Sequence, residues 1–192
     1  MRRPAHGTQR GASVELEEAS LQAPEGLLDL MREIGEGENG FRGERELLTG
    51  ELTLEAFLGR LVAWSAGRDL PAGWVPFTTF WLLDRRRTAV GLSRLRHRLN
   101  AALLEHGGHI GYYVKASERG KGYGRAILAL TLEEAWRLGL ERVLLTVDSG
   151  NQPSVRVIEA NGGVLEDERT DPESGRPFRR YWIGLGPTPT GG

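Results

Sequence analysis

The stretch Val114-Lys-Ala-Ser-Glu-Arg-Gly-Lys-Gly-Tyr-Gly-Arg125 joins a strand-like run, residues 109–114, to a helical run, residues 126–138. Three of its glycines alternate with larger residues and leave backbone N–H groups uncovered where the helix begins. Helix N-termini favour anions, because these N–H groups lack partners and the helix dipole is positive there. Basic side chains add positive charge at the same point. The sequence therefore predicts a cradle for a phosphate-bearing cofactor, formed by Arg119, Gly120, Lys121, Gly122, Tyr123, Gly124 and Arg125.

Two common phosphate-binding loops do not fit this spacing. A Walker P-loop needs Gly-x-x-x-x-Gly-Lys followed by Ser or Thr, and no stretch of the chain matches it. A dinucleotide fingerprint needs Gly-x-Gly-x-x-Gly early in a βαβ unit, with an acidic residue about 20 positions later. The glycines here come late in the chain, and only Asp148 could serve as that acid. The order Arg119-x-x-Gly122-x-Gly124 matches a third pattern instead.

A second motif follows the next strand-like run. Asn151-Gln-Pro-Ser154 opens a helical run that closes at Asn161-Gly162. Together with the glycine motif, it resembles the GNAT superfamily of acetyl-CoA-dependent N-acetyltransferases over about residues 75–185. The run Arg96-His-Arg-Leu-Asn100, with Gly107-Gly-His-Ile-Gly-Tyr112 after it, resembles an uncharacterised bacterial branch of predicted acetyltransferases. Two motifs in this order, separated by a helix and a strand, are far more specific than either motif alone.

The resemblance implies an α/β fold with a central mixed β-sheet, whose fourth and fifth strands are parallel and splayed, flanked by helices. It implies an N-acetyltransferase that moves the acetyl group of acetyl-CoA to a primary amine. The CoA pyrophosphate would suit the amides of residues 120–125, and the pantetheine arm can pair along a strand edge. Two alternatives stay open, a CoA-binding regulatory module without catalysis and a transferase of longer acyl groups. The pantetheine arm is expected to contact Tyr112, Tyr113, Val114, Asn151 and Ser154.

Acetyl transfer needs an oxyanion donor, and can use an acid that protonates the departing thiolate. The resemblance implies a backbone N–H donor on the fourth strand, at Val114 or a neighbour. Family members commonly place the acid, a tyrosine, where this chain has Ile158. Tyr181 on the last strand is the first alternative, and Tyr112 or Tyr113 the others, although each could equally be a structural aromatic residue.

Acetyl transfer also needs a base to deprotonate the amine. Relatives carry a glutamate base at one of two positions, which Gly108 and Thr146 occupy here. His109, next to the first position, is a candidate because an imidazole titrates near neutral pH. His97 and Glu105 are further candidates. The alternative is that the two histidines hold the segment around residues 97–109 against the sheet by hydrogen bonds.

Composition excludes several classes of function. The 192 residues include 25 basic and 26 acidic side chains, so the net charge predicts no pull toward nucleic acid. The longest apolar runs are too short to span a membrane. The absence of cysteine excludes a cysteine-bound metal and an acyl-cysteine intermediate, so we expect no metal and direct attack by the amine. The polar N-terminus lacks the apolar segment of a signal peptide, and we expect a cytoplasmic protein.

The pattern of apolar residues predicts one domain, residues 13–185, with a flexible arm at 1–12 and a flexible tail at 186–192. The apolar run Tyr181-Trp-Ile183 in the last strand suggests that a homodimer could form by strand pairing. Helices are expected at 25–34, 54–66, 100–106, 126–138 and 153–160, and strands at 13–18, 77–84, 88–96, 109–114, 142–147, 164–168 and 178–185.

Overall fold

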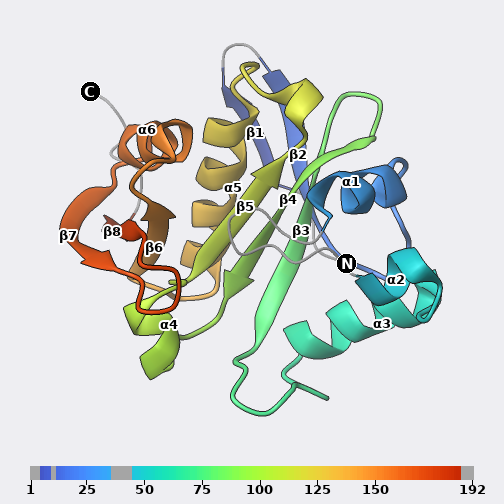
Figure 1. Ribbon diagram of the computed structural model, residues 1–192. Coiled ribbons are helices and arrows are strands. Elements are labelled where there is room, and N and C mark those ends of the chain that lie inside the picture. The colour runs from blue at the N-terminus through green and yellow to red at the C-terminus, as the bar shows by residue number, and fades with distance from the viewer. Residues whose placement is uncertain (1–4, 10–11, 36–44, 187–192) are drawn as a thin grey trace.

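The structure, a computed structural model, describes residues 5–9, 12–35 and 45–186 (Figure 1). In chain order its elements are β1 (Ala5–Gln9), β2 (Ala12–Glu18), α1 (Leu27–Ile34), α2 (Arg45–Thr49), α3 (Leu54–Ser65), β3 (Phe77–Leu83), β4 (Ala89–Arg96), α4 (Ala101–Glu105), β5 (Ile110–Val114), the 3-10 turn η2 (Ala116–Glu118), α5 (Tyr123–Arg137), β6 (Arg142–Asp148), α6 (Gln152–Ala160), β7 (Val164–Thr170) and β8 (Pro177–Gly184).

The strands form two sheets. The first contains β1 to β5 in chain order, and each neighbouring pair is antiparallel. The second has the order β6-β8-β7 and is also antiparallel. Helix α5 carries the chain back along the first sheet, so β5 and β6 run in the same direction (Figure 1). The predicted mixed α/β fold is therefore confirmed.

We call the junction between β5 and β6 the seam. Within the described residues no ladder pairs the two strands, and the only bridge joins Gly108, just before β5, to Leu145 of β6. The strands are thus held together at the beginning of β5 and separate beyond it, which is the predicted splay.

Two apolar cores lie on opposite faces of the first sheet. Helix α5 packs in the first core with both sheets and with α6, through residues such as Ile127, Leu145 and Ile158. Helices α1 and α3 cover the other face and pack on Trp81 and Leu92. The sequence explains this arrangement, because strand β3 is buried at every position and must be covered on both sides.

Side-chain and glycine caps set the beginnings of the helices. The Thr53 hydroxyl accepts a 3.2 Å hydrogen bond from the Ala56 N–H and begins α3. Asn151 begins α6 in the same way, with its side chain accepting from the Ser154 N–H at 3.2 Å. Helix α5 differs, because it begins after Gly122 in a left-handed conformation and no side chain caps it. Its first N–H groups are therefore left for another acceptor.

Two predictions fail at the ends of the sheets. Residues 5–9, expected in a flexible arm, form β1 and pair with β2, because β2 would otherwise leave a backbone edge open. The apolar strand β8 lies between β6 and β7, so its backbone is paired on both sides. The predicted dimer contact by strand pairing at residues 181–183 is therefore wrong. Residues 1–4, 10–11 and 187–192 of the expected arm and tail lie outside the described residues.

Candidate active site

The glycine loop leads from β5 through η2 to α5. Gly120 and Gly122 both have positive φ, 77° and 83°, a conformation that side chains rarely adopt. Gly124 lies within the first turn of α5, and a Cβ there would come 3.3 Å from the Val157 side chain of α6. The loop is thus shaped by two left-handed turns and by close packing of α5 on α6.

The basic side chains of the loop have different roles. Lys121 pairs with Glu118 at 2.8 Å on the surface. The Arg119 Nε donates to the carbonyl oxygen of Val114 at 3.2 Å, and its guanidinium lies 5.4 Å from the centre of the Tyr113 ring. Arg119 therefore holds the loop against the end of β5, whereas Arg125 is exposed on the first turn of α5.

Helix α1 is tied to the same loop. The carboxylate of Glu33 accepts hydrogen bonds from the Ala116 N–H and from the Tyr113 hydroxyl, the latter at 3.1 Å. Tyr113 therefore points to the face covered by α1, while Tyr112 points to the other face. A helix from the N-terminal part of the chain is thus coupled to the glycine loop.

The outer edge of β5 faces the seam. Two hydrogen bonds fix its register with β4, Arg96 N–H to His109 O at 2.8 Å and Lys115 N–H to Val90 O at 3.0 Å. Because backbone groups alternate in an antiparallel pair, the N–H and C=O groups of Tyr112 and Val114 point away from β4. These groups form the outer edge of β5, which ends at the uncapped helix α5; on this edge the Val114 carbonyl oxygen already accepts from Arg119.

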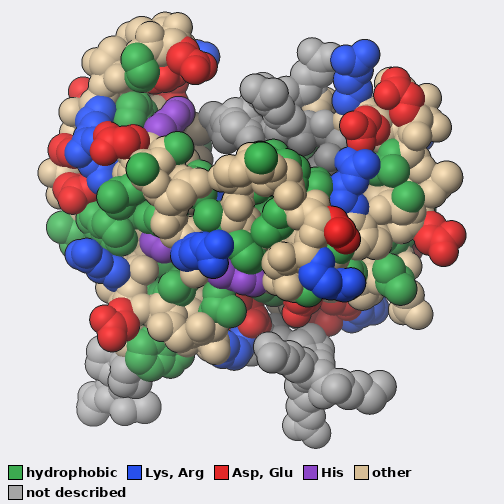
Figure 2. All heavy atoms as spheres, turned by 90° about the horizontal axis from the view of Figure 1, so that it is seen from below, with side chains coloured by type: hydrophobic (Ala, Val, Ile, Leu, Met, Phe, Trp, Pro, Cys, Tyr) green, Lys and Arg blue, Asp and Glu red, His purple; other side chains and the backbone are tan. Residues whose placement is uncertain are grey.

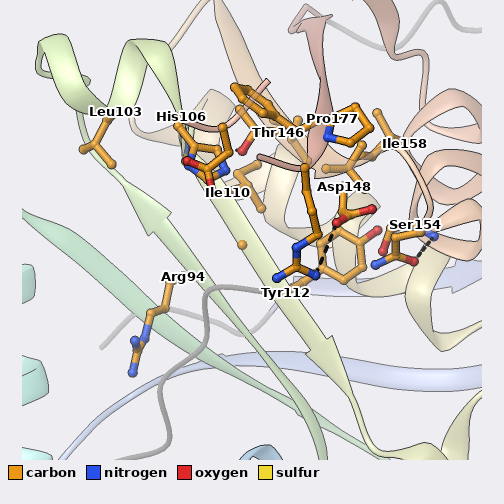
Figure 3. A pocket seen from close by; sticks show the side chains of 18 of the residues that line it. Arg94, Leu103, His106, Ile110, Tyr112, Thr146, Asp148, Ser154, Ile158 and Pro177 are labelled. Carbon is orange, nitrogen blue, oxygen red and sulfur yellow. Dashed lines mark hydrogen bonds and ion pairs between the residues drawn. The ribbon is translucent and has the colours of Figure 1, made fainter. Parts of the chain in front are cut away.

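A cavity of about 500 Å³ lies in the seam (Figure 3). Its walls come from β4, β5, β6, the beginning of α6, the end of α4 and the hairpin that joins β7 to β8. It is lined by Arg94, Arg96, Leu103, His106, Gly107, Ile110, Gly111, Tyr112, Leu145, Thr146, Val147, Asp148, Asn151, Ser154, Ile158, Asp171, Ser174, Arg176, Pro177 and Phe178.

Tyr112 brings a phenol into this cavity. Its hydroxyl is buried, makes no well-formed hydrogen bond to the residues that the structure describes, and has Ser154 of α6 as a polar neighbour. Burial raises the pKa of Tyr112 above its ordinary value of 10.0. Ile158 lies one helical turn after Ser154 and lines the same cavity. The Tyr112 phenol of β5 therefore lies in the region where the resemblance in sequence implies a tyrosine from α6, at the position of Ile158.

The hairpin between β7 and β8 and the end of α4 cover one side of the cavity. The His106 ring packs on Phe178 with a centroid distance of 4.5 Å, and Arg169 of β7 pairs with Glu105 of α4. Arg176 lies 3.8 Å from Asp148.

In Figure 3, His106 and Asp148 lie on the same side of the cavity as Thr146, whereas Arg94 lies apart from them.

The predicted catalytic residue His109 lies at the bridged end of the seam, next to Gly108. Its imidazole is buried, and its Nδ1 accepts a 2.9 Å hydrogen bond from the Leu144 N–H. Burial first, and then the charge of Arg96, lower the pKa of His109 to about 4. His109 is outside the set of residues that line the cavity. Its geometry favours the alternative role, in which the histidine joins strands.

His97 and Tyr181 are also outside the set of residues that line the cavity. His97 Nε2 lies 2.8 Å from the Thr78 hydroxyl, which lies 2.9 Å from the Ser65 hydroxyl of α3. Burial lowers the pKa of His97. Tyr181 is buried and donates to Glu159 of α6 at 3.1 Å. These contacts join helices to sheets, and the structure does not bring the three predicted catalytic residues together.

The structure explains why Gly108 and Thr146 stand at the two positions where relatives carry a glutamate base. Gly108 has a φ of 63°, and a Cβ there would lie 2.3 Å from the carbonyl oxygen of Leu144, so no side chain fits. The Thr146 hydroxyl accepts a 3.0 Å hydrogen bond from the Gly107 N–H. A glutamate at either position would disrupt the contacts that hold the seam.

The sequence reasoning missed several titratable residues of the cavity, among them His106 and Arg96. In the sequence analysis His106 is only the last residue of the predicted helix 100–106. It precedes Gly108 and His109, the two residues that join β5 to β6. Asp148 was considered only as a ribose-binding acid. Arg96, His106 and Asp148 share one feature that the sequence shows: each stands at, or directly after, the end of a predicted helix or strand.

Comparisons with known proteins agree with this geometry. The family model described as "Acetyltransferase (GNAT) domain" matches residues 45–164. An acetyltransferase of the GNAT family from Streptococcus pneumoniae is 18% identical, with a TM-score of 0.62 over 91% of this chain and 100% of that one. RimJ from Mycobacterium smegmatis, solved in complex with CoA-disulfide, is 19% identical, with a TM-score of 0.64 over 90% of this chain and 82% of that one.

A chimera of the Vibrio cholerae spermidine N-acetyltransferase SpeG with hSSAT is 17% identical, with a TM-score of 0.62 over 89% of this chain and 95% of that one. The TM-scores of these three structures show that the fold is shared, and at such low identity they show the fold alone. No curated protein sequence matches this chain. Within the described residues, no helix is long and apolar enough to cross a membrane, and no group of three or more His, Cys, Asp or Glu side chains could hold a metal ion.

Proposed function

The chain belongs to the GNAT acetyltransferase family and is an N-acetyltransferase, and on that premise we propose that it transfers the acetyl group of acetyl-CoA directly to a primary amine. One observation carries the proposal, the open edge of β5 that faces the cavity and leads to the uncapped N-terminus of α5. A pantetheine arm has amides that can pair with such an edge, and a pyrophosphate suits such a helix end.

The residues at this edge fit acetyl-CoA. The N–H and C=O groups of Tyr112 and the N–H group of Val114 would pair with the pantetheine amides. The N–H groups around Gly120, Gly122 and Gly124 would bind the pyrophosphate. Asn151 and Ser154 lie across the cavity at the beginning of α6 and would contact the arm from that side. Arg119 would act indirectly, by keeping the glycine loop against β5.

We assign the oxyanion donor to the outward-facing N–H of Val114 or Tyr112. A preorganised N–H group in a cavity stabilises the negative charge that develops on the acetyl oxygen. The Tyr112 phenol is the best-placed acid for the departing thiolate, because it is buried in the cavity and its raised pKa keeps it protonated at neutral pH. His106 is the histidine at the cavity and is our candidate for the base, in place of His109 and His97.

Release of CoA from acetyl-CoA tests the proposal. The purified protein is assayed with polyamines, amino acids, aminoglycosides and peptide N-termini, with a no-acceptor control. We expect at least one acceptor class to raise the release rate well above the control. Tight binding of acetyl-CoA with no acceptor-dependent release across the panel would instead favour a CoA-binding regulatory module. Replacing acetyl-CoA with longer acyl-CoA donors in the same assay tests the remaining alternative, a preference for a longer acyl group.

A further inference from the structure

Arg96, the last residue of β4, is held at one end of the cavity. Its Nη1 donates to the carbonyl oxygens of Gly108 at 3.0 Å and Gly107 at 3.3 Å. These contacts lock the guanidinium against the turn that precedes β5. Among the residues that the structure describes, both hydrogen bonds of Arg96 use Nη1, so Nε and Nη2 of the planar guanidinium remain for a ligand.

Within the described part of the chain, the side chain of Arg96 contacts carbonyl oxygens and no carboxylate neutralises its charge. Burial and the nearby Arg94 lower its pKa to about 10, so it stays charged at neutral pH. Buried charges in proteins are normally paired, because desolvation without a partner is costly. Arg96 is a half-buried, charged side chain at the cavity wall and can therefore bind an anion there.

The acidic side chains that line the cavity already have partners. Asp148 accepts from the Gly150 N–H at 2.8 Å and lies near Arg176. Asp171 accepts from the Ser174 hydroxyl at 2.5 Å within its own turn. Arg176 is thus the partner of Asp148, and among the described residues that line the cavity Arg96 is the arginine that contacts only carbonyl oxygens. Figure 2 shows the end of the molecule that carries α4, where arginine or lysine side chains and histidines lie on the same face as acidic side chains. At the cavity wall, the charge of Arg96 favours an anionic ligand and disfavours a polyamine.

The anion site is separate from the phosphate-binding region. The glycine loop follows the last residue of β5, whereas Arg96 contacts the turn before its first residue. Arg94 lies opposite Gly111 of β5, and Arg96 lies two residues further along β4, about 7 Å from it at the rise of a strand. Arg96 therefore lies at the opposite end of β5 from the glycine loop, and we assign its anion to the acceptor and not to CoA.

We propose that the acceptor is a small amine that carries a carboxylate, as an amino acid does, and that Arg96 binds this carboxylate. The inference rests on the proposed acetyl transfer and specifies its substrate class. A carboxylate matches the fork of donors on a guanidinium, and charge-assisted hydrogen bonds of this kind give the acceptor both affinity and orientation.

The test compares acceptors that differ only in the carboxylate. CoA release is measured with glycine, β-alanine and γ-aminobutyrate, and with glycinamide and propylamine as counterparts that lack the carboxylate. We expect kcat/KM to be at least about tenfold higher for the best carboxylated amine than for its counterpart. Equal values for both series, or a preference for spermidine, would overturn the inference while leaving acetyl transfer intact. No release with any amine would overturn the proposed function and this inference with it.

Substitution of Arg96 gives the second arm. We expect Arg96→Gln to raise KM for the carboxylated amine at least about tenfold, with little change for propylamine, and Arg96→Lys to restore part of the loss. Arg98→Gln is the matched control, because Arg98 is exposed two residues further along. Acetyl-CoA affinity, measured by calorimetry, and the melting temperature verify that the variants are folded. A loss of equal size for both amines would show that Arg96 has only a structural role and would overturn the inference.

Discussion

His109 and Leu144 bind each other through two hydrogen bonds, from the His109 N–H to the Leu144 carbonyl oxygen at 2.7 Å and from the Leu144 N–H to His109 Nδ1 at 2.9 Å. The second bond requires a neutral imidazole with its proton on Nε2. This pair holds β5 to β6 at one end of the seam. It also makes the junction sensitive to acid.

We predict that His109 makes the protein less stable as the pH falls below about 6.5. In the unfolded chain a histidine gains its proton near pH 6.5, whereas burial holds the folded pKa of His109 at about 4. Protonation therefore favours unfolding between these values, and the free energy of unfolding falls by about 3 kcal/mol from pH 7 to pH 4. Urea unfolding at several pH values measures it. His109→Asn should flatten this dependence, while exposed His106→Asn should not. Identical slopes in the two variants would refute the assignment.

Gly122→Glu should abolish tight binding of acetyl-CoA. A carboxylate at the N-terminus of α5 repels a pyrophosphate, and we expect the dissociation constant to rise by at least about tenfold. Gly139→Glu is the control, since Gly139 has a similar φ of 89° and open space around it at the other end of α5. Calorimetric titration of both variants decides the matter, and unchanged affinity in Gly122→Glu would refute the cofactor assignment.

Tyr112→Phe should lower kcat by about tenfold or more, because it removes the phenol that we assign to the departing thiolate. Burial raises the pKa of Tyr112, so the wild-type acid stays protonated and the deficit should be constant from pH 6 to pH 9. Tyr113→Phe serves for comparison, since that hydroxyl binds Glu33 on the opposite face. If both variants retain wild-type kcat, Tyr112 is not the acid.

Gly108→Ala should destabilise the protein by about 3 kcal/mol or more, from backbone strain and from the clash with the Leu144 carbonyl. Gly139→Ala incurs only the left-handed strain, about 1–2 kcal/mol, because nothing lies within 4 Å of its Cβ. Chemical denaturation compares the two. Equal losses would mean that the close approach at Gly108 is relieved by movement of β6.

The parts of the site that the sequence predicts best are those that local chemistry specifies. The alternate glycines mark the beginning of α5, and Asn151 marks the cap of α6, because each conformation depends on residues within one turn. The same holds for the open edge of β5, whose position follows from the glycine loop that ends it.

The catalytic residues were harder to predict, because they depend on which way a short turn directs its side chains. The positive φ values of Gly107 and Gly108, 116° and 63°, direct His109 into the seam and leave His106 at the cavity. No periodic pattern covers such a turn. Likewise, residues 5–9 contain almost no apolar side chains, and strand β1 exists because it completes the edge of β2.

The single bridge between β5 and β6 has a consequence for how the protein responds to its substrate. With the first sheet and the second joined at Gly108 and His109, the rest of the junction lacks the cross-links of a continuous sheet. A pantetheine arm between β5 and β6 would supply hydrogen bonds of the kind that a neighbouring strand forms. The substrate would then act as a temporary ninth strand, and amide hydrogen exchange along β5 and β6 should slow when it binds and recover when CoA leaves.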